Sequence, residues 1–213
     1  MVTVLASQDT LSVSCVRLYL QCALVADDCA FETVACEFIA QALTVYEDHI
    51  TLAREQLRAF ELIVASLHAT CNLSSANYEA LATKITQYSA QLPRKNEQAS
   101  MVLKCAHLFW HPCQEDGKRV RECLQRSLRI TDSMKDAPSK QIPLFLDILE
   151  ATPEVTLKYL VGLSALIRDH LDTMEHGLMR KEGEVRYRAI ESYMEAMDTC
   201  DVPSSPSSRY EAK

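Results

Sequence analysis

The stretch LAREQLRAFELIVASLHATC, residues 52–71, indicates the fold because its apolar residues return at helical spacing. Steps of three and four residues place side chains on one face of an α-helix, and such a stripe is buried against a neighbouring element. The next segment repeats these steps, so both segments are predicted as packed helices. The two stripes are Leu57, Phe60, Val64, Leu67 and Cys71, then Tyr78, Leu81, Ile85, Tyr88 and Leu92.

The rest of the chain shows the same periodicity. No segment alternates apolar and polar residues in the sustained manner of a strand, so the predicted fold class is all-α. Thr152, Pro153 and Glu154 would start one helix with a hydroxyl cap, a proline in the first turn and an acid beside it. The predicted helices cover residues 8–26, 31–50, 52–71, 76–91, 97–111, 117–134, 139–151, 153–175 and 181–199.

Alternate predicted helices begin about 40–45 residues apart, which is the period of HEAT and armadillo hairpins. We therefore expect residues 1–200 to form an α-solenoid of HEAT-like hairpins. The predicted first helix is apolar on nearly all sides and needs neighbours on both, so we expect a segment to precede it in a longer protein. Residues 201–213, DVPSSPSSRYEAK, are rich in Ser and Pro and are predicted to be a disordered tail.

Composition excludes several classes of partner. The chain has 213 residues with 22 Lys and Arg against 29 Asp and Glu, a formal net charge of −7. This balance argues against nucleic acid and against direct electrostatic attachment to anionic membranes. No apolar run approaches the ~20 residues of a membrane span, and the N-terminus lacks a basic signal-peptide region, so a cytosolic protein is predicted.

The cysteines and histidines offer one candidate metal site. Nine cysteines without a CxxC motif indicate reduced thiols rather than a disulfide framework. His107 and His111, four residues apart, would share a helix face, and Cys105 and Cys113 would complete a zinc set. Cys105 instead lies on an apolar stripe and Pro112 interrupts the helix, so packing is the favoured interpretation. No metal or cofactor is predicted, and a zinc-dependent helical enzyme stays the alternative.

No arrangement typical of an active site is present. The chain lacks a G-x-S-x-G motif. The acid pairs Asp27–Asp28 and Glu47–Asp48 are consecutive, so on a helix their carboxylates point to different sides and make poor acid–base partners. His170 and His176 lie among acids on a predicted long helix and are interpreted as solvated or packing residues. The protein is predicted not to be an enzyme.

Two charged sets lie at predicted helix ends. Glu47 and Asp48 are acidic, whereas Arg94 and Lys95 are basic. Both sets are assigned to the second helix of a hairpin, so we expect them near the same edge of the stack. Solvated helix ends are one interpretation. The other is a two-fold contact in which the acids of one copy meet the bases of another.

Several motifs occur in one order over residues 15–175: RLYLQCAL (17–24), FETVACEF (31–38), QAL (41–43), YED (46–48), CAHLFW (105–110), GKRV (117–120), ECL (122–124) and LFLDIL (144–149). In order and spacing they resemble the C-terminal part of the retromer large subunits, the vacuolar protein sorting-associated protein 35 family. The resemblance implies a right-handed α-solenoid that acts as a non-enzymatic scaffold in retrograde endosome-to-Golgi transport. A generic helical-repeat adaptor unrelated to retromer is the alternative.

The resemblance also implies partners and a location. The C-terminal solenoid would hold the phosphoesterase-fold small subunit, vacuolar protein sorting-associated protein 29. We expect the concave face of residues 117–199 to bind it through exposed aromatic and Met side chains. The chain would be cytoplasmic, peripheral on endosomal membranes and recruited there indirectly, and it would lack the site for the arrestin-like subunit.

Pairing of two copies through the solenoid ends is a further implication of the resemblance. The acidic set there matches Glu47 and Asp48, with His49 in place of a third acid, which implies a weaker and pH-sensitive contact. The matching basic set, in which one of three cations is replaced, is Gln91, Arg94 and Lys95.

Overall fold

A computed structural model describes residues 2–111, 114–134, 138–151, 157–174 and 177–199. These residues are helical apart from short connections and one pair of two-residue strands, which confirms the all-α class. The chain divides into two compact units, residues 1–123 and 124–213. The helices are α1 (Val2–Asp28), α2 (Glu32–His49), α3 (Ala53–Ala69), α4 (Ser75–Ser89), α5 (Lys95–Ala106), the 3₁₀ helix η1 (His107–Phe109), α6 (Gly117–Asp132), α7 (Pro138–Glu150), α8 (Leu157–Thr173) and α9 (Leu178–Thr199).

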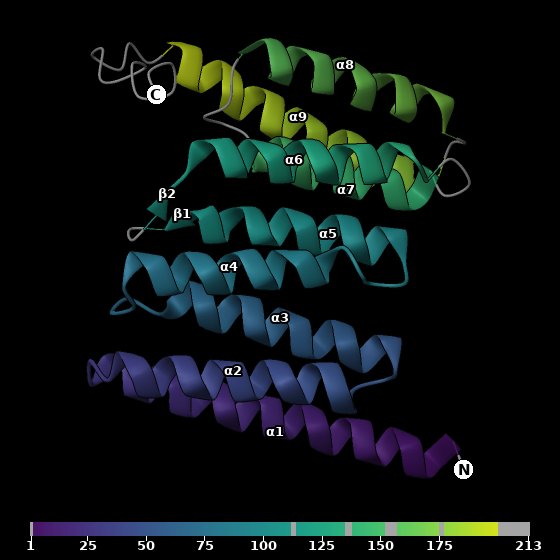
Figure 1. The fold of residues 1–213 in the computed structure, drawn as a ribbon. Coiled ribbons are helices and arrows are strands. Elements are labelled where there is room, and N and C mark those ends of the chain that lie inside the picture. The colour runs from purple at the N-terminus through teal and green to yellow at the C-terminus, as the bar shows by residue number, and fades with distance from the viewer. Residues whose placement is uncertain (1, 112–113, 135–137, 152–156, 175–176, 200–213) are drawn as a thin grey trace. The chain divides into compact units, whose positions relative to one another are not determined.

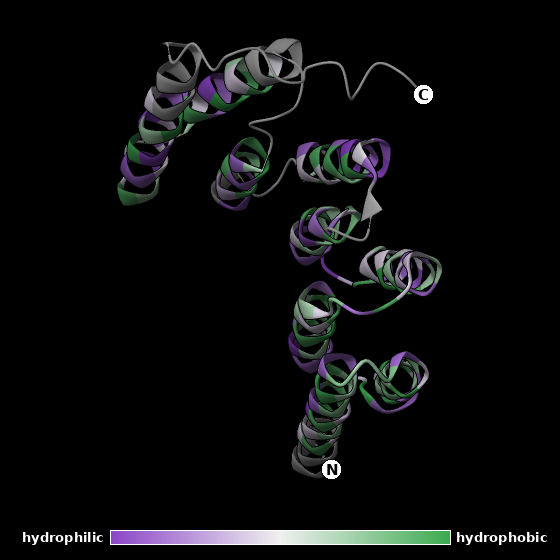
Figure 2. Ribbon diagram, turned by 90° about the vertical axis from the view of Figure 1, so that its left-hand side faces the viewer, coloured by the Kyte–Doolittle hydropathy of each residue, from purple (hydrophilic) through white to green (hydrophobic). Residues whose placement is uncertain are grey.

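Residues 1–123 form stacked antiparallel hairpins. Successive helices from α1 to α5 are connected at alternating ends (Figure 1). Viewed along the helix axes, α1, α3 and α5 form one column, and α2 and α4 form the other (Figure 2). α1 contacts both α2 and α3, and α3 contacts α5. This stacking of HEAT-like hairpins is the α-solenoid architecture expected from the periodicity.

The stretch at residues 52–71 forms α3 and supplies the centre of this unit. Phe60, Val64 and Leu67 are buried as the stripe predicts, and Ile63 is buried beside them. Leu57 is only half-buried, and Cys71 lies beyond the helix end and is exposed. The helix ends where Thr70 turns to extended backbone and its hydroxyl donates to the Leu67 carbonyl at 2.8 Å.

The predicted helix over residues 97–111 is wrong in its last turn. α5 ends at Ala106, and after η1 the strand β1 (Trp110–His111) pairs antiparallel with β2 (Gln114–Glu115). The Asp116 N–H donates to the Phe109 carbonyl at 2.9 Å, which closes this hairpin. The shared helix face expected for His107 and His111 is therefore absent. Pro112 and Cys113 lie outside the described residues.

Two other boundaries differ from the prediction. α1 begins at Val2, six residues before the predicted start at residue 8. α8 begins at Leu157, and the predicted cap at residues 152–154 lies outside the described residues, as does the predicted tail at 201–213.

The second unit is organised around α7, which contacts α8 and α9. Phe145 and Ile148 of α7 and Ile167 of α8 are buried. The Gln141 side chain donates to the Thr131 carbonyl at 2.9 Å, which ties α7 to the end of α6. Arg186 of α9 binds Asp147 and Glu150 of α7, with a shortest contact of 2.5 Å.

Candidate interaction surfaces

The predicted acidic and basic sets both belong to residues 1–123. Glu47 and Asp48 end α2, whereas Arg94 is the N-cap residue of α5 and Lys95 is its first residue. The basic set thus begins a helix rather than ending the second helix of a hairpin. The α2–α3 and α4–α5 connections lie at the same edge of the stack (Figure 1), so both sets lie along that edge.

These charges also have neighbours within the chain. Glu47 lies 3.6 Å from the Lys84 ammonium, and Arg94 lies 3.1 Å from the Glu97 carboxylate. Arg94, Lys84 and Glu47 are largely solvent-exposed, so these ion pairs contribute little to stability. Asp48 and His49 are exposed on the last turn of α2. The edge therefore presents charge that another molecule can reach.

Two of the residues proposed as zinc ligands, Cys105 and His111, are buried among other side chains. Burial raises the pKa of the Cys105 thiol to about 12, so it stays protonated at neutral pH. The His111 ring stacks on Tyr78 with centroids 4.5 Å apart and meets His68 edge-on at 5.8 Å. Burial lowers the pKa of His111 and of His107. Within the part of the chain that is described, no three His, Cys, Asp or Glu side chains converge on a metal position.

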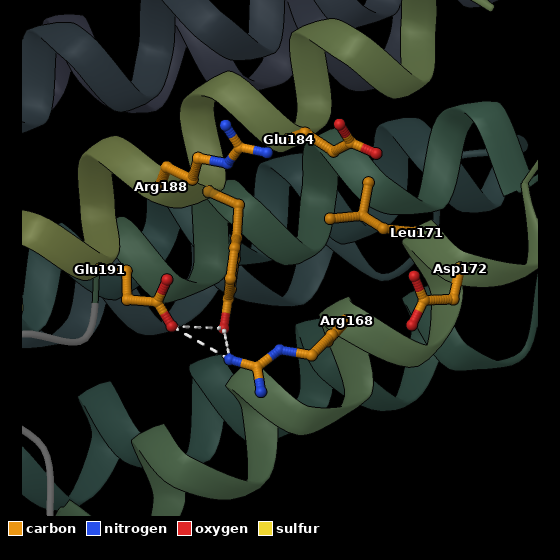
Figure 3. Close-up of a pocket in the computed structure, with 7 residues that line it drawn as sticks. Arg168, Leu171, Asp172, Glu184, Arg188 and Glu191 are labelled. Carbon is orange, nitrogen blue, oxygen red and sulfur yellow. Dashed lines mark hydrogen bonds and ion pairs between the residues drawn. The ribbon is translucent and has the colours of Figure 1, made fainter. Parts of the chain in front are cut away.

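In the second unit, residues of α8 and α9 line a small open pocket of about 270 Å³ (Figure 3). Among the residues that line it, the exposed Arg168 guanidinium lies 3.1 Å from Glu191 and 3.3 Å from the Tyr187 hydroxyl. The hydrogen bond to Tyr187 is the main reason that the pKa of Arg168 is raised. Asp172 and Glu184, on the opposite side, both pair with Arg180. The pocket is thus lined mainly by polar residues of α8 and α9, and its carboxylates pair with arginines.

The sequence analysis did not predict the contacts of Arg168 in this pocket or those of Arg186 with α7. The partners of Arg168 and Arg186 lie 19 to 39 residues away in the sequence. Helical periodicity indicates which face of a helix is polar, but it does not indicate which polar residue of another helix lies opposite.

The structure describes only part of the expected binding face at residues 117–199. The aromatic side chains described within residues 124–192, Phe145 and Tyr187, are buried and cannot be anchors without rearrangement. Among the described side chains of α9, three large apolar ones are exposed instead: Leu178, Met179 and Val185. The exposed cations of α6 are Lys118, Arg121, Arg126 and Arg129.

Among the described helices, none combines the length and the apolar character that a bilayer span requires.

Comparison with known proteins gives a consistent result. The family model described as vacuolar protein sorting-associated protein 35 matches residues 1–170. Vacuolar protein sorting-associated protein 35C of Arabidopsis thaliana is 34% identical over 180 residues, covering 76% of this chain and 23% of the relative. The 35B protein of the same plant is 36% identical over 174 residues, covering 74% and 22%. Vacuolar protein sorting-associated protein 35 of Schizosaccharomyces pombe is 35% identical over 143 residues, covering 64% and 17%. The chain therefore spans less than a quarter of the length of these relatives.

Proposed function

Because the chain belongs to the vacuolar protein sorting-associated protein 35 family, we propose that it is a scaffold segment of the retromer large subunit. In this role it contributes a rigid helical surface to retrograde endosome-to-Golgi transport and carries out no catalysis. It acts in the cytoplasm, peripherally on endosomal membranes, to which other proteins recruit it. The family match over residues 1–170 carries the proposal, and it removes the alternative of an adaptor unrelated to this family.

The partner in the proposal is the phosphoesterase-fold small subunit, vacuolar protein sorting-associated protein 29. Packed helical hairpins suit a large, preformed contact because little backbone order is lost when the partner binds. The exposed Leu178, Met179 and Val185 of α9 are the apolar anchors that the described residues offer in the expected region. Leu178 is 74% exposed, so binding would remove a large apolar area from water.

Calorimetry with the purified small subunit tests this proposal. We expect micromolar or tighter binding by the folded chain, and we expect the double variant Leu178→Glu, Val185→Glu to weaken it at least about tenfold. The matched control is Leu52→Glu, an exposed apolar residue of the first unit, which should bind as the wild type does. Absence of micromolar binding by a folded sample would contradict the proposed partner, and equal affinity of all variants would contradict the α9 anchors.

A further inference from the structure

Helix α6 has a cationic side that faces solvent. Its buried side consists of Cys123, Leu124, Ser127 and Thr131. At about 100° per residue, four exposed cations lie on the opposite side, within an arc of about 140° and a length of about 17 Å. We call these four residues the α6 cation row, and they are Lys118, Arg121, Arg126 and Arg129. Because all four belong to one helix, their spacing follows from helix geometry alone.

The α6 cation row takes part in no ion pair within the part of the chain that the structure describes. Every ion pair found there involves other residues. Arg119, on the same helix, shows the contrast, because its guanidinium lies 2.9 Å from Glu79 and 3.6 Å from Asp116. Glu122 and Asp132 share the exposed side of α6, but the cations outnumber these acids two to one.

The charges of the row are unfavourable to the helix that carries them. The helix dipole opposes positive charge near a helix N-terminus, yet Lys118 is in the first turn of α6 and Arg121 follows it closely. α3 and α5 also begin with cations, but both have an acid in the first turn, whereas α6 has none.

The spacing of the row adds repulsion between like charges. Lys118 and Arg121 are three residues apart, and such neighbours share a helix surface. Arg126 and Arg129 form a second pair of this kind. The chain therefore keeps these four cations at the expense of stability, and an external anion would relieve both effects.

We propose that the α6 cation row is a docking surface for an acidic segment of a partner protein. The complementary segment carries carboxylates at the spacing of the row, in steps of three, five and three residues, which a helix packed alongside α6 provides. This order of steps is the same from either end, so the segment can run in either direction. Glu122 lies inside the row and favours a neutral or basic residue at the centre of the segment.

A narrow acidic segment fits this surface better than an anionic membrane does. The chain has a formal net charge of −7, so a planar anionic surface would repel the rest of the molecule while it attracted the row. A segment as narrow as one helix can be confined to α6. The site includes none of the apolar anchors on α9, and it does not depend on the small subunit being the partner proposed above.

The predicted binding is weak and sensitive to salt. Exposed ion pairs are individually weak, and four of them support a dissociation constant on the order of 0.1–1 mM at low salt. Salt screens charges at the surface, so raised ionic strength should weaken the binding further.

Fluorescence anisotropy with a labelled, alanine-based helical peptide tests the docking. The probe carries four glutamates at the steps of the row, and a reference peptide of the same composition carries them consecutively, which spreads them around the helix. We expect the folded chain to bind the probe at least about threefold more tightly than the reference at low salt. Equal binding of the two peptides, or no binding of the probe at near-millimolar chain concentration, would overturn the proposal.

Charge reversal tests whether α6 is the site. Arg126→Glu, Arg129→Glu should raise the dissociation constant of the probe at least about tenfold. The matched control, Arg17→Glu, Arg54→Glu, reverses two exposed cations of α1 and α3 and changes the net charge equally, so it should have an effect of no more than about twofold. Equal effects of the two variants would overturn the site. Phosphatidylserine vesicles that bind the wild type more tightly than the probe does would overturn the choice of a protein partner.

Lys118→Glu, Arg121→Glu separates binding from stability. Acids near the start of α6 suit the helix dipole, so the thermal unfolding midpoint should rise by about 2 °C while binding of the probe weakens. A lowered midpoint would overturn the argument that these cations serve a partner rather than the fold.

Discussion

The buried carboxylate of Asp27, at the end of α1, accepts the backbone N–H of Cys71 at 2.8 Å. It also accepts the N–H of Asn72 at 3.1 Å, while the Asn72 side chain donates to the Asp27 carbonyl at 2.8 Å. These bonds join residues 44 and 45 positions apart, and they hold the α3–α4 connection on the first hairpin. Asp27 thus has a structural function, although its position in an acid pair suggested only a helix end.

Asp27→Ala should strongly destabilise the first unit. The change leaves two backbone N–H groups without their acceptor at a partly buried position, which should lower the free energy of unfolding by about 1–3 kcal/mol. Asp28→Ala, at the exposed neighbouring residue, should change it by less than about 0.5 kcal/mol. Urea denaturation followed by circular dichroism measures both. Similar losses in the two variants would contradict the role assigned to Asp27.

Acid should weaken the first unit through the buried His111. Burial lowers the pKa of His111 below the ordinary value of about 6.5. The unfolded chain therefore takes up a proton at this residue first as pH falls below about 6.5, and the free energy of unfolding decreases until the folded His111 also titrates. We expect His111→Gln to lose less stability than the wild type between neutral pH and pH 5, when each is compared with its own value at neutral pH.

The matched control for the pH experiment is His49→Gln, because His49 is exposed at the end of α2. Denaturant titrations at a series of pH values should show the same pH dependence for this variant as for the wild type. If His111→Gln and the wild type lose stability in parallel, the buried ring does not contribute in the way described.

Gly183 is required for close packing in the second unit. A Cβ atom there would lie 3.0 Å from the Leu171 side chain and 3.2 Å from that of Ile142. Gly183→Val should therefore destabilise this unit by about 1–3 kcal/mol. The matched control is Gly162→Val on α8, where a Cβ meets no atom within 4 Å. Hydrogen exchange in α7, α8 and α9 should be faster in the first variant and nearly unchanged in the second. Equal exchange in both would contradict the packing argument.

The edge of the stack that carries Glu47, Asp48, Arg94 and Lys95 should support a salt-sensitive contact between copies. The double variant Glu47→Lys, Asp48→Lys should weaken self-association, and mixing it with Arg94→Glu, Lys95→Glu should restore association. Glu37→Lys, an exposed position on the same helix, is the control and should have little effect. Sedimentation at low salt measures all of these. An unchanged mass for every variant would contradict the proposed contact.

The sequence was sufficient for the helices and for the hairpin stacking of the first unit. Stripes such as Phe60, Val64 and Leu67 are buried because a helix with one apolar face gains most free energy by covering that face. The predicted first helix ends at residue 26, and α1 ends two residues later at Asp28.

The interactions that the sequence did not predict depend on contacts between distant residues. Residues 107–111 have helical periodicity, yet β1 forms there because Trp110 and His111 pair with Glu115 and Gln114. The Arg168–Glu191 contact likewise depends on how α8 and α9 face each other. Local spacing does not specify such pairings. For the same reason it does not specify which residues make up the partner-binding face.

Hydrogen–deuterium exchange of the chain with and without the purified small subunit is the most direct test of the central claim. We predict slower exchange in peptides of α6 to α9 when the subunit is bound, and unchanged exchange at the α2–α3 and α4–α5 connections. Unchanged exchange throughout at saturating subunit, or protection confined to α1–α5, would contradict the claim that the later helices hold this partner.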